Sequence, residues 1–335
     1  MKIKPIAVIK YVLLFLIGVF IVYILFKDQH FPDFLKDLKG ANWIWAIISA
    51  MATMIAHFFR ALRWQLMIVP IATQKPGILH TFNALMIGYF TNLLIPRAGE
   101  ITRCAVLSKK ENISVTSLIG TVITERIIDL LVLVILILIS LLLYADLVFS
   151  FLKGLNLNTE NFSDKLLLIG ILVVFTILAF LIFRYFRNKS ALLKKLFNLI
   201  NQFKDGLLSI KKIEKPITFC IYTLVIWVFY ILSSYLCFGV LIETSFLNFS
   251  AALLTVIAGS FGMIAPIQGG IGAYHFMVTE ALALLSINKK IGLEFATIIH
   301  AAQTVSVIIF GIIALILEFT FRKVKHEPKQ SETPA

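Results

Sequence analysis

The sequence predicts an all-α polytopic membrane protein, an inverted repeat of two halves that each contain three spanning helices and one re-entrant helical hairpin. Three observations predict this fold: the chain is strongly apolar, its basic residues lie between apolar stretches, and two apolar stretches contain a Pro-x-x-Gly interruption. Of its 335 residues, 59% are hydrophobic and 15% are charged, and the mean hydropathy is +0.94. This composition excludes an ordinary soluble protein.

Uninterrupted apolar windows define the spanning helices. A helix needs about 20 apolar residues to cross roughly 30 Å of hydrocarbon. The windows that meet this length lie at residues 8–26, 42–66, 114–144, 166–186, 216–242 and 292–319. Because no small-residue cleavage pattern follows the first window, we expect it to be a retained helix and not a removed signal peptide.

Two further apolar regions, 78–111 and 247–288, are each broken near the middle. The breaks are Pro96-Arg97-Ala98-Gly99 and Pro266-Ile267-Gln268-Gly269, which lie 170 positions apart. Proline has no backbone N–H and ends helices, and glycine allows sharp turns. We therefore expect each region to form two short helices joined by a tip at the Pro-x-x-Gly motif.

The distribution of Lys and Arg predicts the orientation, because these residues are retained on the cytoplasmic side of a membrane. With a cytoplasmic N-terminus, the inner segments carry 23 of the 31 Lys and Arg residues, and the outer segments carry 7. This assignment requires region 78–111 to enter and leave from the cytoplasm. It requires region 247–288 to enter and leave from outside, so both regions become re-entrant hairpins.

The predicted domain organisation follows from this topology. Residues 1–325 form a single transmembrane domain with one half at about 8–145 and the other at about 166–320, and residues 326–335 form a disordered cytoplasmic tail. Inverted repeats are typical of secondary transporters, whose substrates bind near the midplane where broken helices meet. Outside the spans, residues 188–212 show the pattern of an amphipathic helix on the inner leaflet, and 31–38 that of a shorter one.

Arg97, Glu100 and Arg103 are the first candidate site residues. In a helix that begins near Ala98, Glu100 and Arg103 share a face, so the carboxylate can hold Arg103 while Arg97 stays at the tip. Ionisable groups at membrane depth are costly, and arginines beside a helix N-terminus suit an anion such as a lipid phosphate. The alternative is that these residues are topology determinants at the cytoplasmic interface.

A second charged group, Glu125, Arg126 and Asp129, lies within the window 114–144. The two acids are four residues apart on one helix face, and Arg126 can pair with either. Two acids with one base leave a group that can take up a proton and couple transport. The alternative is a buried ion-pair network that braces the first hairpin.

The second hairpin contains five glycines between Gly259 and Tyr274, which allow a close approach of backbone or ligand. Gln268, His275 and Glu280 are the polar side chains nearby, and we interpret such lone groups first as packing residues. Arg60 and Arg63, beside Trp64, are interpreted as interfacial anchors, with attraction of anionic headgroups as the alternative.

Several classes of chemistry are not indicated. Cys104, Cys220 and Cys237 have no metal-ligand spacing, and the sequence shows no Ser-His-Asp order, no His-Glu-x-x-His motif and no nucleotide-binding loop. The net charge of +13 is spread between apolar spans, which favours membrane topology over nucleic acid. We expect no metal, no cofactor and no nucleic-acid partner.

Three motifs together carry a family resemblance. Asn92 to Arg103 reads Asn-x-Leu-x-Pro-Arg-x-Gly-Glu-x-x-Arg, Glu125 to Asp129 reads Glu-Arg-x-x-Asp, and Pro266 to Gly272 reads Pro-x-x-Gly-Gly-x-Gly. The chain resembles the flippase-like transmembrane region of lysylphosphatidylglycerol synthases over roughly Ile9 to Phe321. The motif residues carried over by this resemblance are Arg97, Glu100, Arg103, Glu125 and Arg126.

The resemblance implies a lipid flippase-like membrane region without the cytosolic aminoacyl-transfer domain found in two-part members. This chain ends at Ala335, 16 residues after Phe319, which is too short for that domain, so we expect no synthase activity. The predicted substrate-binding residues are Asn92, Pro96, Arg97, Gly99, Glu100, Arg103, Glu125, Arg126, Asp129, Pro266, Gln268, Gly269, Gly270 and Gly272.

The function predicted from these observations is movement or binding of a phospholipid or lipid-linked headgroup between the leaflets of an inner (plasma) membrane. Both termini are expected in the cytoplasm. One alternative is a membrane-embedded transferase with Glu125 or Glu100 as base. Another is a non-transporting subunit that docks a lipid-modifying synthase through its basic inner face. The expected partners are lipids with polar headgroups, anionic inner-leaflet lipids and such a synthase, and the chain can form an oligomer.

Overall fold

A computed structural model describes residues 5–27, 31–145 and 213–322. Every regular element in these ranges is helical. The chain divides into two compact units, Met1–Val122 together with Ile213–Ala335, and Ile123–Lys212. The predicted span 166–186, the amphipathic segment 188–212 and the polar tail 326–335 lie outside the described residues.

The helices of the described residues follow each other closely along the chain. They are α1 (Pro5–Phe26), α2 (Phe31–Gly40), α3 (Trp43–Ile68), α4 (Ile78–Leu94), α5 (Gly99–Glu111), α6 (Val115–Leu143), α10 (Pro216–Cys237), α11 (Phe249–Ile264), α12 (Ala273–Ala283) and α13 (Lys289–Arg322). Short 3₁₀ turns are η1 (Val69–Ile71), η3 (Phe238–Val240), η4 (Ile242–Thr244) and η5 (Gln268–Gly270).

Four helical segments of the described residues are long and apolar enough to cross a membrane: Trp43–Ile71, Val115–Leu143, Pro216–Val240 and Lys289–Glu318. They confirm the windows 42–66, 114–144, 216–242 and 292–319. The predicted first span, 8–26, lies within α1, which has 22 residues. The predicted short helix at 31–38 is α2.

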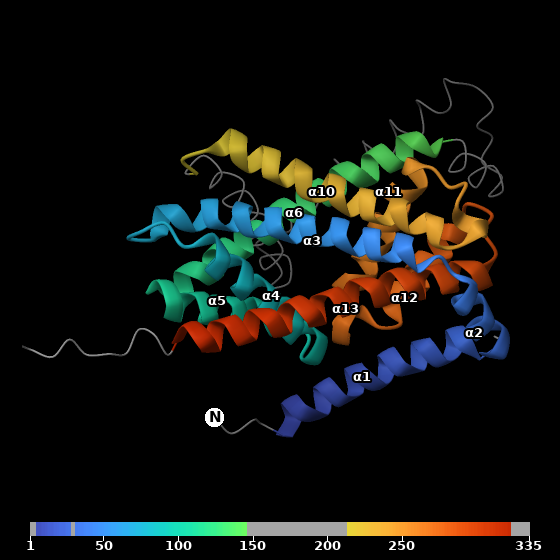
Figure 1. Cartoon of the computed structure of the whole chain (residues 1–335), viewed down its shortest axis with the longest axis horizontal. Helices are drawn as coiled ribbons and strands as arrows, with labels where there is room; N and C mark the ends of the chain where they lie inside the picture. The colour runs from blue at the N-terminus through green and yellow to red at the C-terminus, as the bar shows by residue number, and fades with distance from the viewer. Residues whose placement is uncertain (1–4, 28–30, 146–212, 323–335) are drawn as a thin grey trace, which may run out of the picture. The chain divides into compact units, whose positions relative to one another are not determined.

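Helices α3 and α10 form the centre of the first unit, and they run antiparallel (Figure 1). Near the start of α3, Ser233 is hydrogen-bonded to Ser49 (3.0 Å) and Thr53 (2.7 Å), while Arg63 near the other end reaches Thr223 (3.4 Å). Small side chains let apolar helices approach closely, and serine and threonine hydroxyls bond across them. These contacts therefore fix the register of the pair.

The regions 78–111 and 247–288 form two helical hairpins, with α4 packed on α5 and α11 packed on α12. Both hairpins lie along α13, whose 34 residues extend about 51 Å at 1.5 Å per residue. Figure 1 shows α12 beside the first part of this helix and α4 with α5 beside its last part.

Contacts along α13 show that the hairpins approach from opposite ends. At its start, Lys289 binds Glu280 near the base of the second hairpin (2.7 Å), and near its end Glu318 lies 3.8 Å from Lys110 at the base of the first. Between them, His300 meets the second tip at Gly269, and Gly311 lies against Phe90 of α4. The two tips therefore point toward each other along one helix.

Candidate functional site

The first tip begins where α4 ends, at Leu94. Pro96 disfavours a helical conformation of the residue before it, and Ile95 is extended (φ −130°, ψ 111°). Arg97 adopts a left-handed conformation (φ 63°), which reverses the chain. The side-chain oxygen of Asn92 then accepts a hydrogen bond from the backbone N–H of Gly99 (2.7 Å), and this bond closes the tip.

Gly99 is required by the close packing of the first hairpin. A Cβ at this position would overlap the carbonyl oxygen of Gly88 in α4 and would lie 2.7 Å from the side-chain amide of Asn92. The two helices of the hairpin therefore touch through their backbones. The residues of this motif are explained by local geometry: Pro96 ends the helix, Asn92 closes the turn, and Gly99 allows the contact.

The second tip is an irregular segment between Ile264, the last residue of α11, and Ala273, the first of α12. Three glycines in it have positive φ: Gly269 (57°), Gly270 (73°) and Gly272 (85°). Residues with a side chain rarely adopt such values, so the glycine-rich sequence is what permits this turn. Gln268 and Gly270 are buried, whereas Pro266 is exposed.

The structure brings the two tips together. The guanidinium of Arg97 donates a hydrogen bond to the carbonyl oxygen of Ile264 (3.2 Å), and a Cβ on Gly269 would lie 3.1 Å from Leu93 Cδ2. The last carbonyls of a helix have no partner within it, so Arg97 supplies one for α11. Two Pro-x-x-Gly segments that are 170 residues apart in the sequence thus form one site.

Arg103 lies away from the tip, inside the protein. It is 2% exposed, and its guanidinium carbon lies 4.6 Å from the centre of the Trp64 ring in α3. The indole N–H of Trp64 donates to the Thr121 hydroxyl (2.9 Å). Arg103 therefore packs α5 against α3, and Glu100 is half-buried in the first turn of α5, where the helix dipole favours a negative charge.

The second unit contains Glu125, Arg126 and Asp129. On helix α6, Glu125 is fully buried, Asp129 is half-buried and Arg126 is exposed. Each has an interaction partner. The use of this group in binding or proton coupling, and the alternative of a buried ion-pair network, stay predictions.

The interpretation of Arg60 and Arg63 as interfacial anchors did not include their burial inside the protein. Their exposed fractions are 6% and 0%, because α3 continues to Ile68 and α10 covers this face. Arg60 donates to the Tyr230 hydroxyl (3.3 Å), and Arg63 donates to Thr223 and lies 5.8 Å from the Phe219 ring. Both arginines therefore help to join the two central helices.

The sequence contains a signal for this burial that our reading missed. Five residues of α3 follow each other at alternating spacings of four and three positions. They are Ser49, Thr53, Ala56, Arg60 and Arg63. Such a spacing places all five on one side of a helix. Because Ser49 and Thr53 contact α10, the same spacing predicts that the two arginines face it as well.

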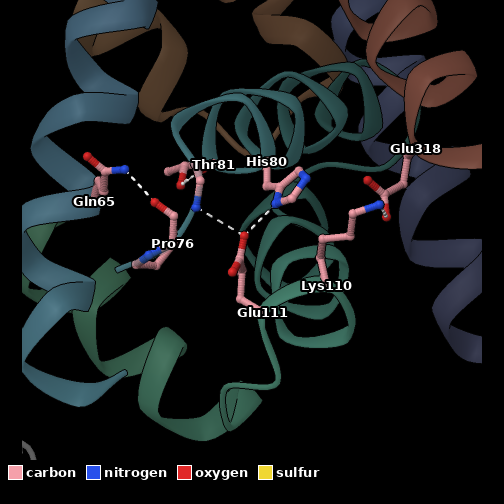
Figure 2. Close-up of polar contacts among 8 residues, drawn as sticks. Gln65, Pro76, His80, Thr81, Lys110, Glu111 and Glu318 are labelled. Carbon is pink, nitrogen blue, oxygen red and sulfur yellow. Dashed lines mark hydrogen bonds and ion pairs between the residues drawn. The ribbon is translucent and has the colours of Figure 1, made fainter. Parts of the chain in front are cut away.

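Polar side chains also form a cluster at the base of the first hairpin (Figure 2), and the sequence motifs did not indicate it. Glu111 at the end of α5 accepts hydrogen bonds from the Gly77 N–H (3.1 Å) and from His80 Nδ1 (2.5 Å). Gln65 of α3 donates to the Pro76 carbonyl (2.5 Å). With the Lys110–Glu318 ion pair, this cluster ties the hairpin base to α3 and α13.

The long apolar helices define the chain as a multi-pass helical membrane protein. The family described as the lysylphosphatidylglycerol synthase TM region matches residues 8–311, and the chain belongs to this family. The match includes both hairpins and the helices around them. No curated protein and no solved structure matches the chain.

Proposed function

We propose that this protein moves a phospholipid, or another lipid with a polar headgroup, between the two leaflets of the plasma membrane. Family membership supports a lipid-related role, because the family is named for the membrane region of enzymes that make a modified phospholipid. The match covers a membrane region, which is the part that would carry transport or binding. The proposal includes re-entrant hairpins related as an inverted repeat, with both termini in the cytoplasm.

The observation that carries the proposal is the meeting of the two tips. Irregular backbone in the hydrocarbon region is tolerated where protein buries it or where it lines a polar cavity. In transporters with inverted repeats, substrates bind where broken helices meet near the midplane. Here Arg97 and Gly269 bring two broken-helix tips into contact from opposite ends of α13.

In the proposed mechanism, Arg97 is the residue that meets the headgroup. Its side chain is exposed and is held by one hydrogen bond to a backbone carbonyl, which a phosphate can replace with stronger charge-assisted bonds. The N-terminus of α5, which begins two residues later, adds backbone N–H groups and a favourable dipole. If Arg97 bound a phosphate in place of the Ile264 carbonyl oxygen, the tips would separate and the headgroup could enter between them.

The remaining predicted site residues fit this mechanism in different ways. Asn92, Pro96 and Gly99 shape the first tip, and Pro266 with the glycines of the second tip shapes the surface opposite Arg97. Glu100 and Arg103 lie farther along α5. We propose that these two residues stabilise the conformations that the protein adopts during transport. We propose the same role for Glu125, Arg126 and Asp129.

The experiment is a leaflet-exchange assay in liposomes. Purified protein should accelerate the loss of fluorescence of headgroup-labelled phospholipids when dithionite is added, compared with empty liposomes. Arg97→Ala should slow the exchange about tenfold, which corresponds to one lost charge-assisted hydrogen bond of about 1.4 kcal/mol. Lys109→Ala, on the exposed side of helix α5, which follows Arg97, is the matched control and should keep the wild-type rate.

A negative result would favour other functions. Wild-type protein that matches empty liposomes for anionic, cationic and zwitterionic headgroups, with and without a pH gradient, would rule out the proposal. Co-purification of a stoichiometric lipid-modifying enzyme would then favour the docking subunit. Covalent modification of a lipid would favour the transferase.

A further inference from the structure

A pair of buried histidines lies directly beneath the second tip. His275 is the third residue of α12, and His300 comes from the middle of α13. Their rings are 4.9 Å apart between centroids, and their exposed fractions are 7% and 9%. Neither residue has a role in the function proposed above, and both are bonded to backbone groups of the tip.

The chemistry of these bonds fixes where the protons are. The carbonyl oxygen of Gly269 can only accept, so Nε2 of His300, at 2.8 Å, must carry a hydrogen. The backbone N–H of Gly272 can only donate, so Nδ1 of His275, at 3.4 Å, must carry none. His275 is therefore neutral, with its hydrogen on Nε2, and it closes the N-terminus of α12.

Protonation would affect the two histidines differently. A protonated imidazole has hydrogens on both nitrogens. His300 would keep its bond to Gly269, but His275 could no longer accept from Gly272. The new charge would also sit at the N-terminus of α12, where the helix dipole is unfavourable to a cation, and 4.9 Å from His300. A proton on His275 therefore opposes the closed tip.

Within the part of the chain that the structure describes, the groups that pack around His275 offer no counter-charge for that proton. On its own helix, Tyr274 is adjacent, and His300 is the titratable group that α13 presents to it. Helix α11 has no titratable residue. Helix α1 meets the tip at Gly18 and Ile21; its Lys10 and Tyr11 lie seven or more positions before Gly18, and its Tyr23 is exposed. The thiol of Cys237 in α10 lies near Tyr274.

We propose that His275 is a proton-binding site that couples protonation to release of the second tip from the first. In this step a hydronium ion gives its proton to Nδ1 of His275 and leaves as water, and the Gly272 N–H loses its acceptor. Gly269 and Gly272 then let the tip move away from Leu93 and Arg97. The transport consequence rests on the proposed function, for which it names the proton as coupling ion.

Hydrogen exchange of the purified full-length protein tests the site without any transport. Amide exchange of the segment 265–276 is measured by mass spectrometry at about pH 8 and about pH 5, on either side of the ordinary histidine pKa of about 6.5, and corrected for intrinsic rates. Wild-type protein should exchange about fivefold faster at the lower pH, the equivalent of one lost hydrogen bond of about 1 kcal/mol. The segment 92–102 of the first tip is the internal reference.

Two variants assign the effect. His275→Asn keeps a side-chain oxygen that can accept from Gly272 but does not titrate, so its exchange should be independent of pH. His300→Gln keeps a donor for Gly269, and its pH response should remain. A pH-independent wild type, a response that survives in His275→Asn, or a response that is lost in His300→Gln would each overturn the proposal.

The design separates this inference from the proposed function and from a folding defect. If His275→Asn does not fold, as judged by gel filtration, His275→Gln replaces it, and the wild-type measurement stands on its own. If hydrogen exchange at the tip depends on pH but the protein does not accelerate lipid exchange, the proton-site proposal stands and the flippase proposal is ruled out. If lipid exchange does not respond to a pH gradient and hydrogen exchange at the tip does not depend on pH, the flippase proposal stands and the proton-site proposal is ruled out.

Discussion

At the scale of single residues, the first hairpin depends on the lack of a side chain at two positions. Gly88 and Gly99 bring the backbones of α4 and α5 into contact, and a Cβ at either one would overlap the other residue's carbonyl. Small residues have this effect wherever apolar helices must approach closely without a hydrophobic driving force. The tip that carries Arg97 is therefore held by backbone packing.

This packing predicts the effect of adding one methyl group. Gly99→Ala should destabilise the protein by about 1–3 kcal/mol, because the inserted carbon has no space between Asn92 and Gly88. The measurement is thermal unfolding of the purified variant in detergent.

The matched control is Gly120→Ala in α6, where a Cβ would meet nothing within 4 Å. It should leave the stability unchanged or raise it by up to about 1 kcal/mol, because alanine is the better helix former. Equal unfolding temperatures for the two variants would show that the hairpin relaxes to accept the methyl group.

At the scale of elements, helix α2 is attached to the start of α13. Asp37 of α2 accepts a hydrogen bond from the Lys290 ammonium (2.7 Å), and the Phe34 ring packs edge-on against Phe26 of α1 (5.0 Å). The hydrogen bond from Lys290 holds the pKa of Asp37 below its ordinary value. The same turn of α13 holds the base of the second hairpin through Lys289 and Glu280.

The lowered pKa of Asp37 predicts a pH dependence with a definite sign. A carboxylate whose pKa is lower in the folded state than in the unfolded state stabilises the folded protein at pH values above the unfolded-state pKa. This stabilisation is lost as the pH falls through the folded-state pKa. For an aspartate that starts near 4, α2 should therefore stay attached at neutral pH and loosen only in strong acid.

Hydrogen exchange of residues 31–40 between about pH 6 and about pH 3, corrected for intrinsic rates, measures this loosening. Asp37→Asn should show the looser state at every pH. Were wild-type and Asp37→Asn α2 segments to exchange alike at pH 6, the ion pair would have no part in holding the helix.

At the scale of the whole molecule, the first unit is organised by α13. Its start holds the base of the second hairpin, its end holds the base of the first, and both tips lie between. A helix of this length that crosses a membrane places its ends on opposite sides. The two hairpin bases would then lie on opposite faces of the membrane.

Cysteine labelling in intact cells tests this arrangement. Single cysteines at Lys75 and Lys110 should react only with reagents that reach the cytoplasm. Cysteines at Ser245 and Lys289 should react with impermeant reagents added outside. If the two ends of either hairpin were labelled from opposite faces, that hairpin would cross the membrane and the inverted repeat would be ruled out.

The sequence by itself determined the features that depend on neighbouring residues. The long apolar windows predicted the four spanning helices of the described residues, and Pro96 and Pro266 marked the breaks, because helix length and helix termination are set within a few residues of the chain. The motif residues Asn92, Pro96 and Gly99 could be recognised as a turn for the same reason. The family followed from three such local motifs.

Only the tertiary structure decided which distant residues meet. The contact between Arg97 and Ile264, the pair of His275 and His300, and the burial of Arg63 each join residues or helices that are far apart in sequence. Helical periodicity tells which residues share a face, but the partner of that face is chosen by packing among all helices. For this reason the charge pattern, which counts Arg63 among the basic residues of the inner side, could not predict that α10 covers it.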